Sequence, residues 1–100
     1  MTDSESENIQ LPPTSIWPHI SKLSIAEDKP IMLDYWVDSL EKKVLIGIRT
    51  NDEKLLVKNA EEYTSPIAKI YKIDSVFIIC TENSIYLTSS DIDKRRISSS

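Results

Sequence analysis

The chain has one histidine, His19, and one cysteine, Cys80, so few routes to acid–base or nucleophilic chemistry are open to it. As a general base, His19 would need an oriented carboxylate and a nucleophile, and no neighbouring residue in the sequence specifies either. Cys80 ends the apolar run that begins at Val76, where a buried strand is expected, and a thiol in apolar surroundings has a raised pKa and reacts poorly. We therefore expect an inert thiol and a structural or surface histidine.

Neighbouring acids are the next candidates, because paired carboxylates can hold a metal ion or share a proton. The closest pairs are Glu61 with Glu62, and Asp91 with Asp93. The first pair falls in an expected solvated connection, and the second is followed directly by cations that would neutralise it. Gly47 is the only glycine, and a single glycine cannot build the phosphate-binding loops of nucleotide enzymes. The sequence thus predicts a non-enzymatic protein with no cofactor and no metal centre.

Two short basic clusters lie in an expected turn and near the C-terminus: Lys42 with Lys43, and Lys94 with Arg95 and Arg96. With exposed aromatic rings between them, such clusters can hold single-stranded nucleic acid by phosphate contacts and base stacking, as small barrels do. The net charge of −4 and the acids close to both clusters oppose this interpretation. Single-stranded nucleic-acid binding is therefore the alternative function, and a solvated face is the simpler interpretation of both clusters.

Length and composition indicate one small globular domain. The chain has 100 residues, of which 40% are hydrophobic and 28% charged, which is ordinary for a protein with a single core. Its longest uncharged apolar run, residues 76–80, is far shorter than the ~20 residues that cross a bilayer. The N-terminus, MTDSESENIQ, lacks the basic and apolar regions of a secretory signal, and a lone cysteine suits a reducing compartment. We expect a cytoplasmic or nuclear location.

The first half of the chain reads as a tail followed by a meander. Residues 1–15 are polar, acidic and proline-containing, so we expect a disordered tail. Residues 16–29 predict a short helical or irregular segment, with Trp17 extended because it precedes a proline. From residue 30 the period becomes two, which predicts strands over 31–37, 44–49 and 54–58 in an antiparallel meander. The strand over 44–49 is almost wholly apolar, which is typical of a central strand.

The second half predicts another hairpin. Residues 59–66 form a longer connection with room for one helical turn. Residues 66–73 fit either a helix begun by Ser-Pro or a strand, and the strand is preferred because seven residues are short for a helix. Strands over 76–81 and 84–88 follow, then a helical turn over 91–96. The fold class is mainly β: a small antiparallel barrel or sandwich of about five to six strands over residues 16–97, with a frayed end at 98–100.

One face of the expected strand over 31–37 is the candidate binding surface. Met32, Asp34 and Trp36 fall opposite the regular apolar face, and Tyr86 is an aromatic residue that an adjoining strand could supply. Exposed tryptophan and methionine on a sheet face are typical of partner-binding surfaces. The alternative is that residues 16–25 fold over this face and bury it.

The function predicted first is a protein-protein interaction module, serving as an adaptor, a small complex subunit or an inhibitor. It would bind another protein, or a second copy of itself, through this face or through an exposed strand edge. Gly47 predicts a bulge, a bend or a close approach within the sheet.

Overall fold

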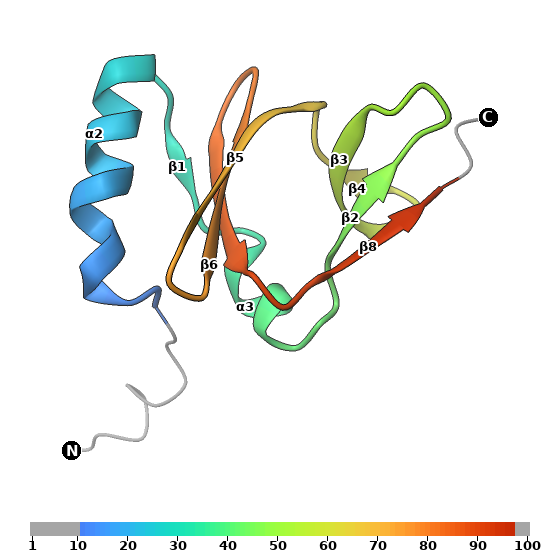
Figure 1. Cartoon of the computed structure of the whole chain (residues 1–100), viewed down its shortest axis with the longest axis horizontal. Helices are drawn as coiled ribbons and strands as arrows, with labels where there is room; N and C mark the ends of the chain where they lie inside the picture. The colour runs from blue at the N-terminus through green and yellow to red at the C-terminus, as the bar shows by residue number, and fades with distance from the viewer. Residues whose placement is uncertain (1–10, 98–100) are drawn as a thin grey trace.

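The protein, as described by a computed structural model of residues 11–97, forms three layers: a helix, a four-stranded sheet and a second four-stranded sheet (Figure 1). Most of the predicted tail over 1–15 and the predicted frayed end over 98–100 lie outside the described residues. The elements are η1 (Thr14–Ile16), α2 (Trp17–Glu27), β1 (Ile31–Met32), α3 (Trp36–Leu40), β2 (Leu45–Ile48), β3 (Lys54–Asn59), β4 (Glu62–Tyr63), β5 (Ile67–Ile73), β6 (Val76–Thr81), β7 (Ile85–Ser89) and β8 (Asp93–Arg96).

The strands pair in two open sheets. Sheet A has the order β1-β7-β6-β5, and sheet B has the order β4-β3-β2-β8. β1 runs parallel to β7 and β8 runs parallel to β2, while the other neighbouring pairs are antiparallel. The prediction of a small, mainly β fold is confirmed. Its details are wrong, because the described chain has eight strands in mixed sheets that do not close into a barrel.

Alternate residues of sheet A face two separate cores. In the central strand β6, Ile78 packs into the core beneath α2, and Ile79 packs into the core between the two sheets. The first core contains Ile16, Ile20, Trp36, Val76, Ile78, Cys80, Ile85 and Leu87. The second contains Tyr35, Val44, Ile46, Leu56, Ile79 and Ile92. Because both faces of β6 are covered, its sequence is almost wholly apolar, as predicted for a buried strand.

The N-terminal segment is a regular helix rather than an irregular one. α2 spans 11 residues, with Ile16 just before it and Ile20 within it, both fully buried against sheet A. It ends at Asp28, whose left-handed backbone (φ 56°) lets the next N–H bond back to the Ser24 carbonyl. The expectation that Trp17 is extended is wrong, since Trp17 is already helical (φ −60°, ψ −39°). Pro18 falls in the first turn, where a missing N–H costs no hydrogen bond.

The expected strand over 31–37 stops after two residues. The chain turns at Asp34 and enters the short helix α3. Tyr35 and Trp36 are both buried, but Tyr35 enters the core between the sheets and Trp36 enters the core beneath α2. Their opposite directions produce in a turn the same alternation that a strand would show, which misled the sequence interpretation. The predicted three-stranded meander is therefore wrong, because β1 belongs to sheet A while β2 and β3 belong to sheet B.

Strands β2, β3, β5, β6 and β7 lie where the sequence places them, and residues 67–73 form the preferred strand and not the alternative helix. The connection over 59–66 holds the strand β4 in place of a helical turn, because the Asn59 side chain accepts the N–H groups of Glu61 and Glu62 and turns the chain back. Local alternation therefore predicted the longer strands that pair with their sequence neighbours, but it missed the two-residue strand β4.

The predicted helical turn over 91–96 is the strand β8, which pairs with β2. Beyond β8, Ile97 donates its N–H to the carbonyl of Ile48 and lays its side chain over Gly47. A Cβ built on Gly47 would stand 2.7 Å from Ile97 Cδ1 and 3.1 Å from Val57 Cγ2. The pairing of β2 with β3 continues without a shift through Gly47, so the glycine marks a close approach and not a bulge.

Candidate interaction surface

The two residues with the most reactive side chains lie on different elements. His19 is exposed on α2. Cys80 is buried in β6 with 1% of its surface exposed, and this burial, with a smaller contribution from Glu27, raises the pKa of its thiol. A raised pKa leaves little thiolate near neutral pH, so Cys80 acts as a small apolar side chain. Across residues 11–97, no group of three or more metal-ligating side chains comes together, and no helix is long and apolar enough to span a membrane.

The predicted partner-binding residues are dispersed. Trp36 is only 5% exposed and packs in the same core as Ile16 and Ile20, so the N-terminal segment covers it, as the alternative interpretation held. Met32 is half-buried in β1 and lies in register with the half-buried Tyr86 of β7. Asp34 is exposed in the turn before α3. The placement of Trp36 on an exposed sheet face was therefore wrong, because residue 36 lies in a helix that turns the indole inward.

Tyr86 packs against the core between the two sheets. Its ring meets the ring of Tyr35 edge to face, with 5.3 Å between centroids. Lys58 lies 4.9 Å from the centroid of Tyr35 and forms an ion pair of 3.2 Å with Asp38. Burial, and then the negative charges around it, raise the pKa of Tyr35, so its hydroxyl stays protonated near neutral pH. This cluster is packed and satisfied, which suits a structural role.

The predicted nucleic-acid residues are exposed, and Lys43, Arg95 and Arg96 form ion pairs. Lys42 and Lys43 lie in the turn after α3, where Lys43 pairs with Glu41 at 3.0 Å. Lys94, Arg95 and Arg96 lie on β8, at the edge of sheet B. Arg95 contacts Asp93 at 3.3 Å, and Arg96 contacts Asp52 at 2.9 Å. Ion pairs of this kind reduce the positive field that a phosphate backbone would meet.

The outer edge of β5 is the most extended unpaired backbone in sheet A. β5 has seven residues and ends the sheet, with β6 on one side only. Its two-residue turn, Asp74–Ser75, makes Ile73 and Val76 the closing hydrogen-bonded pair, so the peptide groups of Ile70 and Lys72 point away from β6. No described backbone group bonds to β5 on that outer side.

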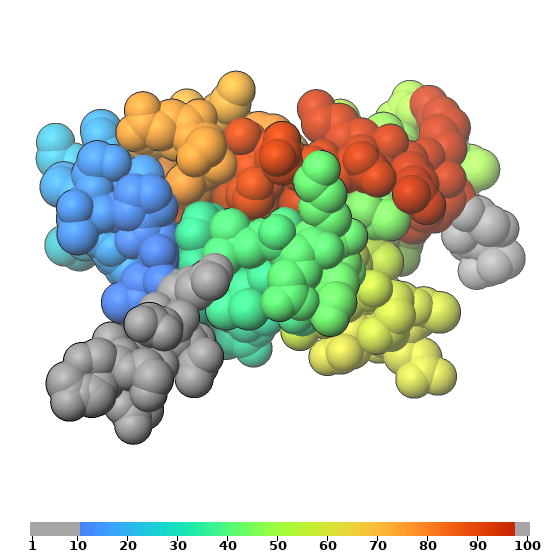
Figure 2. Space-filling model, turned by 90° about the horizontal axis from the view of Figure 1, so that it is seen from below, coloured from blue at the N-terminus to red at the C-terminus, as the bar shows by residue number. Residues whose placement is uncertain are grey.

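A groove of about 420 Å³ runs between this edge and α2. Helix α2 contributes His19, Lys22, Leu23 and Ala26, strand β5 contributes Tyr71, Lys72 and Ile73, and β6 contributes Ile78. The spacing of His19, Lys22 and Ala26 places them on one side of the helix, next to the side that packs on the sheet. In Figure 2 the blue surface of α2 stands beside the orange surface of β5 and β6.

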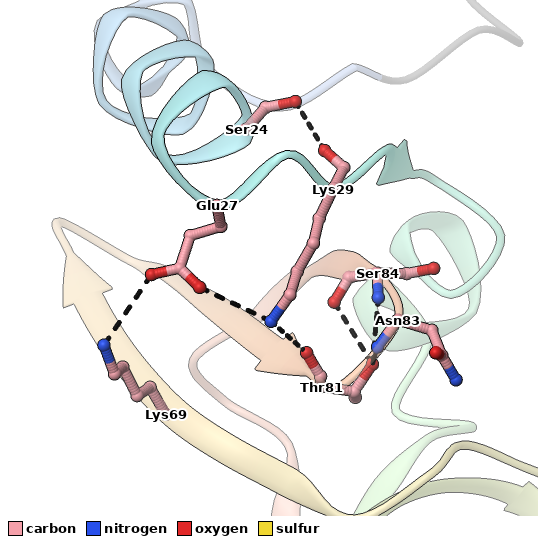
Figure 3. A network of polar contacts seen from close by, with 7 residues as sticks. All are labelled: Ser24, Glu27, Lys29, Lys69, Thr81, Asn83 and Ser84. Carbon is pink, nitrogen blue, oxygen red and sulfur yellow. Dashed lines mark hydrogen bonds and ion pairs between the residues drawn. The ribbon is translucent and has the colours of Figure 1, made fainter.

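A polar network holds the end of α2 in place beside β5 (Figure 3). Glu27 lies 3.4 Å from the Lys29 ammonium and 3.7 Å from the Lys69 ammonium, which links the helix to β5. Lys29 also donates to the carbonyl of Thr81 at 2.7 Å, and its own carbonyl accepts the Ser24 hydroxyl. The network therefore links the C-terminal end of α2 to β5 and β6.

Sequence reasoning named an exposed strand edge as a binding option but assigned no residues to it. The groove depends on where α2 lies across sheet A, and no local pattern contains that information. The spacing of Lys69 and Lys72 on a strand with no acidic residue was the only signal available in the sequence. The chain matches no family model, and no curated protein or solved structure is significantly similar to it.

Proposed function

We propose that this protein is a non-enzymatic interaction module whose β5 edge receives an extended segment of a partner protein. The observation that supports this most strongly is the free outer edge of β5 beside the groove under α2. In strand addition, backbone hydrogen bonds supply affinity, and pockets for alternate side chains supply specificity. The β5 edge offers backbone hydrogen bonds through Ile70 and Lys72, and the groove offers a pocket for side chains.

The other edges of the sheets are less suited to receive a strand. β1 and β4 have two residues each, which is too short to form a stable ladder. β8 has four residues, all exposed and charged, and charged side chains are a common protection of edge strands. β5 has a register shift between Ile67 and Lys69, after which the regular run from Lys69 to Ile73 remains available.

Nucleic-acid binding is less well supported, because two of the three cations of β8, Arg95 and Arg96, lie against acids. Arg95 and Arg96 are each paired with a carboxylate, and a phosphate would have to displace it. Two exposed tyrosines could act as stacking platforms, and neither lies beside β8. Tyr71 lies on sheet A beside α2, and Tyr63 lies on β4, at the opposite edge of sheet B.

Selection of a displayed random-peptide library against the immobilised wild-type protein and two variants tests the proposal. Lys72→Pro removes an N–H that points away from β6, so the ladder within sheet A stays intact while the outer donor is lost. Lys72→Ala removes the same side chain and keeps the N–H. We expect extended peptides to be enriched on wild type and on Lys72→Ala, and to bind Lys72→Pro roughly a hundredfold more weakly.

Both variants should keep the wild-type circular dichroism spectrum, which confirms that the sheet is intact. Equal enrichment on Lys72→Pro would show that the outer backbone of β5 takes no part in binding and would contradict the proposed function.

A further inference from the structure

We infer that the partner segment is acidic and that it places apolar side chains in the groove beneath α2, an inference that rests on the proposed function. Helix α2 and strand β5 bring Lys22, Lys69 and Lys72 to this edge, although the whole chain carries a net charge of −4. No carboxylate lines the groove. Among the described residues, Lys22 and Lys72 form no ion pair.

Two acids close in sequence to the groove residues, Glu27 and Asp74, have other partners. Glu27 holds Lys29 and Lys69, and Asp74 accepts the Ser15 hydroxyl at 3.3 Å. Lys22 and Lys72 are both exposed and form no ion pair with another described residue. A strand that brings carboxylates to this edge gains electrostatic attraction, and one that brings lysines meets repulsion.

The same charges argue against a second copy of this chain as the occupant. If two β5 strands paired edge to edge, each copy would bring the unpaired Lys72 and no carboxylate of β5 to the shared edge. Like charges opposite one another across a strand pair are destabilising. An acidic segment avoids that repulsion and leaves the apolar wall of the groove available.

The groove sets which face of the added strand is apolar. Tyr71 and Ile73 are cross-strand partners of Ile78 and Val76, so they lie on the face of sheet A that packs under α2. A strand added next to β5 would continue that face into the groove, where Leu23 and Ala26 stand above it. Alternate residues of the segment would therefore be apolar, and the residues between them would lie on the same face as Lys72, the partner of Phe77, and carry the carboxylates there.

Three synthetic peptides as long as β5, which has seven residues, test the inference by fluorescence anisotropy. In each, valine, phenylalanine and valine occupy alternate positions, and the remaining positions are all glutamate, all lysine or all threonine. We expect the glutamate peptide to bind roughly tenfold more tightly than the threonine peptide and the lysine peptide to bind most weakly. The difference should shrink at high salt, since the contacts are exposed.

Charge-reversed variants test whether Lys22 and Lys72 cause the preference for the glutamate peptide. The double variant Lys22→Glu with Lys72→Glu should invert the preference toward the lysine peptide. The matched control, Lys54→Glu with Lys94→Glu, makes the same change in net charge with exposed lysines of sheet B. It should leave the preference for the glutamate peptide within about twofold of wild type. Circular dichroism spectra verify that each variant is folded.

The outcomes separate this inference from the function on which it rests. If all three peptides bind equally and Lys72→Pro abolishes each, the edge accepts strands but the acidic partner is overturned. If none binds at about 1 mM, both ideas fail. If the protein forms a dimer in sedimentation experiments and Lys72→Pro dissolves it, the occupant is a second copy and the inference is again overturned.

Discussion

Replacing Trp36 by alanine is expected to lower the free energy of unfolding by about 3–5 kcal/mol, the usual cost of deleting a large buried aromatic side chain. Trp36 is 5% exposed and joins α3 to the core that α2 and sheet A share. The cavity left by the indole would loosen contacts from Ile16, Ile20 and Leu87 together. Denaturant unfolding followed by circular dichroism measures the change.

A Trp36→Phe variant provides the matched control. The indole Nε1 of Trp36 is buried, and no described group accepts its hydrogen bond. Phenylalanine keeps most of the apolar contact and removes this unsatisfied donor, whose burial carries a penalty. We expect a loss of about 1 kcal/mol, smaller than for alanine. If Trp36→Ala left stability unchanged and removed only partner binding, the indole would belong to a binding surface and its assignment to the core would be wrong.

Replacing Ile79 by alanine is expected to cost about 3 kcal/mol of unfolding free energy. Ile79 is fully buried at the centre of β6 and packs into the core between the two sheets, with Tyr35 and Ile46. Its loss therefore removes contacts that hold sheet B against sheet A. Thermal and denaturant unfolding measure the change.

Ile25→Ala is the control for Ile79→Ala, because it deletes the same atoms at a site that is 81% exposed on α2. We expect it to change stability by less than about 0.5 kcal/mol. Similar losses in the two variants would contradict the layered arrangement.

The strands that the sequence predicted well are those whose partners are neighbours in the chain. β5, β6 and β7 form hairpins with short turns, and in β6 the apolar run reports burial on both faces. The failures at β1 and β8 depend on distant contacts. β8 has the sequence DKRR, which carries no strand pattern of its own, and it is a strand because it pairs with β2, far earlier in the chain.

The candidate surface was harder to predict than the fold, for the same physical reason. Trp36 suggested an exposed aromatic face because its alternation with Tyr35 matched a strand, whereas a turn sends the two side chains into different cores. The groove requires α2 to lie beside β5, and the contact of Glu27 with Lys69 that secures this spans much of the chain. The two lysines of β5 were visible in the sequence, but they indicate a binding edge only because the strand is unpaired on one side.

Amide hydrogen exchange at β5, measured by NMR, tests the central claim most directly. In the free protein, the amides of Ile70 and Lys72 should exchange fast because they point away from β6, while those of Tyr71 and Ile73 should be protected. With saturating glutamate peptide, Ile70 and Lys72 should become protected as well. Protection of these two amides in the free protein, or their continued fast exchange in the complex, would contradict the claim that β5 receives a partner strand.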